Sequence, residues 1–239
     1  MCAGHCLGSG GGSIKLTVSA LKQREVMFTV HTELPITQRV LIAITGASGV
    51  VHGVRLLEML RPLNGVETHV VISKAGGLTL AAECDCGVAE VEALADVVHL
   101  AANIGAAPAS GSFRLDAMII APCSIKTASN LAYGNTADLI TRAADVMLKE
   151  RRSLVMAVRE TPLHAGHLET LQRLAGLGAV IFPPLPAFYH KPVSVAEIID
   201  QSCMRMLDQI GIAVDEAPRW GEADGIIAIG DKIKNQGEA

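Results

Sequence analysis

Apolar runs of strand length alternate with longer amphipathic stretches along most of this chain, and this alternation constrains the fold more than any other feature. We expect buried strands at 39–45, 67–73, 115–122, 152–160 and 179–186. Helical periodicity predicts helices at 53–63, 74–83, 136–149, 164–178 and 194–212. Strands that alternate with helices form a parallel sheet through right-handed crossovers, with helices on both faces. The sequence therefore predicts one doubly wound, Rossmann- or flavodoxin-like α/β domain with three layers.

The predicted domain does not occupy the whole chain of 239 residues. Residues 1–38 keep no clear period and contain the linker-like stretch "GSGGGS", so we expect a flexible N-terminal extension there. We place the folded domain at 39–220 and a C-terminal tail at 221–239.

Composition and charge exclude several functional classes. A formal net charge of −4 provides no basic surface for nucleic acid. No uncharged apolar run approaches the roughly 18 residues of a membrane span, and the N-terminus lacks the pattern of a secretory signal. We therefore expect a cytoplasmic protein whose six cysteines are free thiols.

A glycine-rich turn, "ITGASG", follows the first predicted strand. Its glycines, Gly46 and Gly49, permit close backbone approach, Ser48 offers a hydroxyl, and the following helix N-terminus attracts an anion. A tight strand-to-helix turn with no ligand would have the same residues. The second strand ends in Ser73, where a nicotinamide-binding fold has Asp or Glu, and this favours a ligand with an uncharged polyol chain.

The third strand is followed by small hydroxyl side chains in "APCSIKTASN". Ser124, Thr127 and Ser129 surround Lys126 at a junction where parallel sheets bind ligands. The alternative is that Ser124 only caps the next helix. Two such junctions beside a glycine turn favour a site for phosphate and a polyol.

Charged residues stand at two further places. Arg142, Asp145 and Lys149 share one polar face of the helix predicted at 136–149, and a surface ladder of ion pairs would explain them equally well. Arg159 and Glu160 leave a buried strand together at the ligand-binding edge. Burying charge without a task is costly, so we interpret this pair as functional.

The loop "PPLPAFYHKP" is stiffened by proline and carries Tyr189 at the same edge, which makes Tyr189 a candidate substrate contact. Arg205 lies off the apolar stripe of the last helix and could reach the same region. His164 and His167 have spacing that permits metal binding, but no acidic or cysteine partner is near, and helix capping is the favoured role.

Several segments, in this order and spacing, resemble the UbiX-type flavin prenyltransferases, formerly called phenylacrylate or 3-polyprenyl-4-hydroxybenzoate decarboxylases. They are "ITGASG", "VISKA", "PCSIKT", "TRAADVMLKERR", "VRETPLH" and "PPxPAFYHKP". The resemblance runs from Arg39 to Trp220. "RETPLH" and "PAFYHKP" are highly specific, whereas "GASG" alone is not.

The resemblance implies transfer of a dimethylallyl group from dimethylallyl phosphate to the N5 nitrogen of reduced FMN, with closure of a fourth ring through C6. The flavin is then the substrate, and prenylated FMN is the cofactor of a separate UbiD-type decarboxylase. The resemblance also implies a homo-oligomer, expected to be a dodecamer, with sites at subunit interfaces. The choice between dimethylallyl phosphate and the diphosphate stays open.

The family's site residues carry over to matching positions of this chain. The implied flavin contacts are Gly46, Ala47, Ser48, Ser73, Ser124, Ile125, Lys126, Thr127 and Arg159. The implied contacts of dimethylallyl phosphate are Tyr189, Arg205, Arg142, Lys149, Ser48 and the covering aromatic Trp220. Glu160 is the implied proton-transfer residue, and Glu83 is a second carboxylate near the site. Because cations can stabilise the departing phosphate and no aspartate-rich motif is present, we expect activity without a metal.

Three other interpretations deserve comparison. An FMN-dependent decarboxylase of the cysteine-decarboxylase group shares the P-x-S-x-x-T junction, which Pro122, Ser124 and Thr127 satisfy, but it leaves Arg159, Glu160 and Tyr189 unexplained. A non-enzymatic flavin carrier or accessory subunit of a decarboxylase would give Glu160 no task. A nicotinamide-dependent oxidoreductase is disfavoured by Ser73.

Overall fold

A parallel sheet forms the centre of the domain in a computed structural model that describes residues 38–214. Its strands are β1 (Gln38–Ile44), β2 (Val66–Ile72), β3 (Val97–Leu100), β4 (Ala117–Cys123), β5 (Ser153–Val158) and β6 (Val180–Ile181). They lie in the order β3-β2-β1-β4-β5-β6, and every neighbouring pair is parallel. This is the order of doubly wound dinucleotide-binding sheets. The predicted fold class is confirmed.

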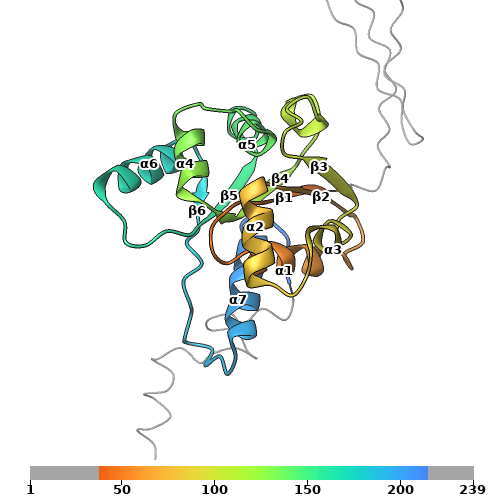
Figure 1. The fold of residues 1–239 in the computed structure, drawn as a ribbon, viewed down its shortest axis with the longest axis vertical. Helices are drawn as coiled ribbons and strands as arrows, with labels where there is room; N and C mark the ends of the chain where they lie inside the picture. The colour runs from red at the N-terminus through yellow and green to blue at the C-terminus, as the bar shows by residue number, and fades with distance from the viewer. Residues whose placement is uncertain (1–37, 215–239) are drawn as a thin grey trace, which may run out of the picture. The chain divides into compact units, whose positions relative to one another are not determined.

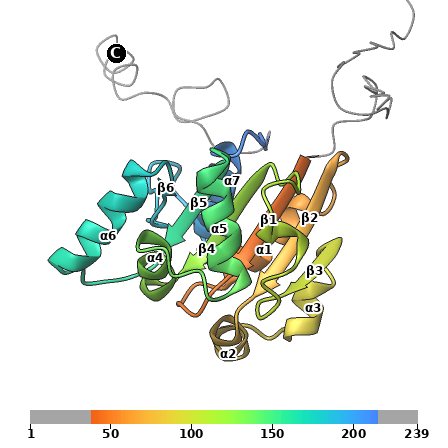
Figure 2. The same cartoon turned by 90° about the horizontal axis from the view of Figure 1, so that it is seen from above.

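Helices cover both faces of the sheet (Figures 1 and 2). The described helices are α1 (Val51–Leu60), α2 (Lys74–Glu83), α3 (Val88–Glu92), α4 (Ile125–Ala132), α5 (Leu139–Lys149), α6 (Ala165–Gly176), α7 (Val195–Asp208) and a short 3-10 turn, η1 (Ala107–Ala109). Residues of α1, α2, α3 and α7 pack into one apolar cluster, and those of α4, α5 and α6 into another. None of the helices in residues 38–214 has the length and apolar content needed to cross a bilayer.

The central strands are apolar throughout because both of their faces are buried. Along β1, Val40, Ile42 and Ile44 enter the cluster beneath α1, whereas Leu41 and Ala43 enter the cluster beneath α5. Alternate side chains of a strand point to opposite faces, so a strand between two helix layers needs apolar residues at every position. This is why the continuous apolar runs were the reliable strand signal.

The structure corrects several predicted boundaries. Strand β3 was not predicted, and the last strand is confined to Val180–Ile181 instead of 179–186. Its predicted continuation contains Pro183 and Pro184, which have no N–H to donate to a neighbouring strand. Helix α5 begins at Leu139, later than the predicted residue 136, because Asp138 caps it by accepting a hydrogen bond from the Thr141 N–H.

The chain reverses its winding between β1 and β4, and the carboxyl ends of these strands are tied together. The Thr45 hydroxyl donates to the Pro122 carbonyl at 2.8 Å and accepts from the Ser124 N–H at 2.8 Å. Thr45 is 2% exposed, so this bridge is part of the core. Ligands of doubly wound sheets bind at such a switch point.

Candidate active site

A cavity of about 840 Å³ lies at the carboxyl ends of the strands, at the switch point between β1 and β4. Each of the first five strands contributes residues that directly follow it or lie just beyond it. The lining is Thr45, Gly46, Ala47, Ser48, Ser73, Lys74, Ala75, Leu78, Ala101, Ala102, Ser124, Ile125, Lys126, Thr127, Asn130, Ala137, Asp138, Arg159 and Glu160. All of the predicted flavin contacts, and the predicted proton-transfer residue Glu160, are in this set.

The glycine turn after β1 is shaped by its protein neighbours. A Cβ at Gly46 would overlap the side chain of Ala75 at the start of α2, and Gly49 has a φ of +97°, which side chains rarely adopt. Glycine at these two positions therefore follows from packing and from backbone conformation. The open side of the turn, with Ala47 and Ser48, faces the cavity.

An internal carboxylate already occupies the helix N-terminus behind this turn. Glu83, the last residue of α2, accepts hydrogen bonds from the N–H groups of Gly49 at 2.8 Å and Val50 at 3.2 Å. Although burial raises its pKa, hydrogen bonds from the Ser48 hydroxyl and these two amides lower it overall, and the charge of Arg159 adds to the effect. Glu83 does not line the cavity. In this structure it is the anion that the N-terminus of α1 binds.

Ser73 and Ser124 have the same local role at their two junctions. The hydroxyl of Ser73 accepts from the Gly76 N–H at 2.9 Å, and that of Ser124 accepts from the Thr127 N–H at 3.2 Å. Both residues are N-caps, of α2 and α4, and both line the cavity. A capping hydroxyl accepts with its oxygen and keeps a hydrogen to donate. Capping and ligand binding are therefore compatible roles.

Charged side chains of both signs line the cavity. Lys74, Lys126 and Arg159 are the cations, and Asp138 and Glu160 are the acids. Sequence reasoning missed Lys74, Asn130, Asp138 and Thr45. A search of the first two helical turns after each strand would have found Lys74 and Asn130. Asp138 precedes a helix that leads back toward the opposite edge of the sheet, so no strand end indicated it.

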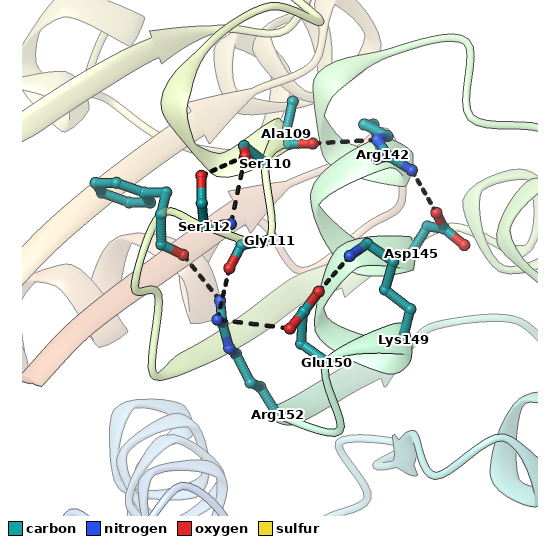
Figure 3. Close-up of polar contacts among 10 residues, drawn as sticks. Ala109, Ser110, Gly111, Ser112, Arg142, Asp145, Lys149, Glu150 and Arg152 are labelled. Carbon is teal, nitrogen blue, oxygen red and sulfur yellow. Dashed lines mark hydrogen bonds and ion pairs between the residues drawn. The ribbon is translucent and has the colours of Figure 1, made fainter. Parts of the chain in front are cut away.

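Arg142 and Lys149 do not line the cavity, and their side chains make polar contacts with other residues (Figure 3). The guanidinium of Arg142 donates to the Ala109 carbonyl at 3.2 Å and pairs with Asp145 at 2.7 Å. The ammonium of Lys149 pairs with Glu150. Helix α5 begins beside the cavity at Asp138 and runs about 16 Å from there, at 1.5 Å per residue. Lys149 is thus at the end of the helix far from the chain's own cavity.

Tyr189 and Arg205 form a third group, also outside the cavity. Tyr189 accepts a hydrogen bond from the side-chain amide of Gln201 at 3.1 Å, and Arg205 follows Gln201 by four residues, one turn along α7. Tyr189 therefore contacts α7 one helical turn before Arg205. Arg205 pairs with Asp208 at 2.6 Å. Trp220 lies outside the described residues.

The expected capping role of His164 is wrong. His164 occupies the N-cap position of α6, but its side chain makes no capping hydrogen bond and its ring lies 3.5 Å, centroid to centroid, from that of His167. Within residues 38–214, no three His, Cys, Asp or Glu side chains are grouped in a way that could hold a metal ion.

The fold and the cavity define a doubly wound α/β protein with a ligand-sized cavity at its topological switch point. A family model for flavoproteins matches residues 29–215. The chain belongs to this flavoprotein family and, within it, to the UbiX-type flavin prenyltransferases.

The similarity to curated relatives covers nearly all of their length. The chain is 52% identical to the flavin prenyltransferase UbiX of Escherichia coli over 77% of this chain and 98% of that one. It is 51% identical to UbiX of Archaeoglobus fulgidus over 77% of this chain and all of the relative, and 48% identical to the mitochondrial flavin prenyltransferase of Saccharomyces cerevisiae over 79% and 78%.

Two solved structures give the same result. AnUbiX, crystallised with FMN and dimethylallyl pyrophosphate, superposes with a TM-score of 0.76 at 48% identity, covering 78% of this chain and 99% of that one. A dodecameric FMN-dependent UbiX-like decarboxylase from Escherichia coli superposes with a TM-score of 0.75 at 43% identity, covering 77% and 99%. An FMN-dependent cysteine decarboxylase at 16% identity shares the fold alone.

Proposed function

We propose that this chain transfers a dimethylallyl group from dimethylallyl phosphate to reduced FMN and releases prenylated FMN. The observation that carries the proposal is the meeting of Arg159 and Glu160 with the two hydroxyl-capped junctions around one cavity at the switch point. A flavin carrier needs the cavity, but it gives the Glu160 carboxylate in the lining no function.

The cavity suits FMN in size and in chemistry. Its volume of about 840 Å³ lies within the range of small-molecule sites. Lys126 and the hydroxyls of Ser124 and Thr127 surround the N-terminus of α4, a place that favours a phosphate group. Ser73 and Asn130 can bond the ribityl hydroxyls, and Arg159 can contact the ring system.

The transferase reaction breaks the allylic C–O bond of the donor and forms a bond to the flavin N5 nitrogen. Negative charge develops on the departing phosphate, so cations such as Arg142, Lys149 and Arg205 stabilise the transition state. Glu160, which lines the cavity, would accept the proton that N5 loses. Tyr189 would help to bind the donor phosphate.

The donor-binding cations would have to come from more than one copy of the chain. Lys149 is at the end of α5 far from its own cavity, and α5 and α7 pack against opposite faces of the sheet. A single chain therefore does not bring Lys149 and Arg205 to one place. We propose that a homo-oligomer, most simply a dodecamer like the Escherichia coli relative, completes each cavity with cations of a neighbouring copy.

The product would serve a UbiD-type decarboxylase as its cofactor, and the proposed donor is the monophosphate. The diphosphate is the alternative, because AnUbiX was crystallised with dimethylallyl pyrophosphate. We propose that the reaction takes place in the cytoplasm.

The deciding experiment is anaerobic. The purified protein is incubated with chemically reduced FMN and with either dimethylallyl phosphate or the diphosphate. The mass of the extracted flavin is then measured by mass spectrometry. A gain of one isoprene unit with the monophosphate supports the proposal. Glu160→Gln should retain FMN but lose transfer by at least about 100-fold. Unchanged FMN, bound tightly by a protein that is stable in the assay, would favour the decarboxylase or carrier instead.

A further inference from the structure

The C-terminal end of α5 is bound to a segment that precedes it by more than thirty residues in the chain. This segment, residues 109–113, begins at the last residue of the 3-10 turn η1 and lies along α5 (Figure 3). Ala109 provides the carbonyl that holds the guanidinium of Arg142. The segment therefore contacts the same helix face that carries the proposed donor-binding cations.

Arg152 connects segment 109–113 to the end of α5 through the two terminal nitrogens of its guanidinium. One nitrogen donates to the Phe113 carbonyl at 2.9 Å and the other to the Gly111 carbonyl at 2.8 Å. The second nitrogen also lies 4.0 Å from a carboxylate oxygen of Glu150, and the side chain is 22% exposed. A planar fork reaches two acceptors at once in fixed geometry, which the single ammonium of a lysine does not.

The backbone of Gly111 lies against the ion pair of Lys149 and Glu150. A Cβ at this position would overlap a carboxylate oxygen of Glu150 and lie 2.7 Å from the ammonium nitrogen of Lys149. The φ of Gly111 is not positive, so an alanine could adopt the same backbone conformation. A side chain at Gly111 would therefore displace the ends of the Lys149 and Glu150 side chains and leave the backbone unchanged.

We propose that Arg152 and Gly111 are positioning residues for donor binding. Arg152 fixes segment 109–113 against α5, and the bare backbone of Gly111 leaves Lys149 and Glu150 in the arrangement that presents the ammonium to the donor phosphate. Arg142 is held from the same segment through Ala109. The inference rests on the proposed function, because it takes Lys149 and Arg142 to be the groups that bind this phosphate.

The test pairs Gly111→Ala with Gly105→Ala, a matched control in the same connection. A Cβ at Gly105 meets only the side chain of Asn103 at an ordinary 3.5 Å. A second pair, Arg152→Lys and Arg151→Lys, keeps the charge and provides an answer if Gly111→Ala does not fold. The affinity of the FMN-loaded, full-length protein for inorganic phosphate is measured by calorimetry, and the KM for dimethylallyl phosphate by anaerobic turnover.

Gly111→Ala and Arg152→Lys should each raise the phosphate Kd and the donor KM about tenfold, the cost of a weakened charge-assisted contact. The Kd for FMN should stay at its wild-type value, because a general structural defect would weaken the binding of FMN and of phosphate alike. Wild-type phosphate and donor constants in both variants, or an equal loss of FMN affinity, would overturn the inference. If wild type forms no prenylated flavin, the proposed function fails, and the phosphate titration still decides the positioning role.

Discussion

The carboxylate of Glu83 accepts a hydrogen bond from the backbone N–H of Gly49 at 2.8 Å, so the end of α2 caps the start of α1. The two residues are 34 positions apart, and their contact ties the glycine turn to the end of α2. Glu83 thus has a structural task that accounts for its place beside the site, whether or not it also takes part in the chemistry.

Glu83→Ala should lower the free energy of unfolding by about 1 kcal/mol, the usual cost of losing a cap, and the melting temperature by about 2–4 °C. Because the pKa of Glu83 is lowered in the folded protein, its contribution is present above its ordinary value of 4.5 and is lost as pH falls through the folded-state pKa. Thermal melts at pH 7 and pH 4 measure both effects. Glu169→Ala, at an exposed position of α6, is the control. Equal shifts for the two variants would contradict the capping role.

Two inactive variants should complement each other if neighbouring copies share a site. Glu160→Gln removes the proton acceptor from a copy's own cavity. Lys149→Ala removes the cation that a copy contributes to the cavity of its neighbour. After dissociation and random reassembly of an equimolar mixture, about one quarter of the sites combine an intact Glu160 with an intact Lys149 from the neighbour. Prenyl transfer should return to about that fraction of wild type. A mixture as inactive as its components would place both groups in one chain's own site.

Acidification should weaken the β2–β3 edge of the sheet. His69 on β2 and His99 on β3 share a hydrogen bond of 2.8 Å between ring nitrogens. Burial, together with the neighbouring His69, lowers the pKa of His99. As the pH falls below the unfolded-state pKa, His99 therefore binds a proton in the unfolded chain before it does so in the folded chain. The free energy of unfolding should therefore fall as pH drops through about 6.5, the unfolded value.

Denaturant titrations at pH 7.5 and pH 5.5 measure this loss, and His99→Gln should reduce it because glutamine keeps a donor for His69 but does not titrate. The carboxylate of Glu67 also contacts His69. Although burial opposes the shift, hydrogen bonds from His69 and Arg39 lower its pKa, so it titrates below this range. An unchanged pH dependence in His99→Gln would rule out His99 as the source.

Removal of divalent metals should leave prenyl transfer unchanged, because in the proposed reaction Arg142, Lys149 and Arg205 supply the positive charge at the leaving phosphate. The measurement is turnover after dialysis against a chelator, compared with turnover after adding back Mg²⁺. Activity that disappears on chelation and returns with Mg²⁺ would show that these side chains are not sufficient.

The sheet could be predicted where its strands are buried on both faces, and not elsewhere. Strands β1, β2, β4 and β5 are continuous apolar runs. Strand β3 has only four residues, "VVHL", in which Val98 and Leu100 are exposed and His99 interrupts the apolar run, so no periodic signal remains. It is nevertheless fixed in register, since its backbone pairs with β2 from His69 to Ile72.

The cavity could be predicted because the carboxyl ends of parallel strands meet at one edge of the sheet. Lys149 shows where this reasoning ends. The sequence placed Lys149 on the polar face of a helix, but a helix that leads into β5 runs from the carboxyl edge back to the amino edge, so its last turn lies away from the cavity. Which copy of the chain supplies a charge depends on assembly, and the pattern of one chain carries no direct signal of that.

Every residue of helix α5 makes a packing contact or a polar contact. Of its eleven residues, seven are buried, Leu148 packs against the second apolar cluster, and Arg142, Asp145 and Lys149 are held in polar contacts. Helix α6, by contrast, buries only Thr170 and Leu174. A substitution in α5 therefore disturbs either the core or a charged contact, and few exchanges are neutral. We expect α5 to diverge far more slowly than α6 among related chains, which makes it a durable marker of common descent.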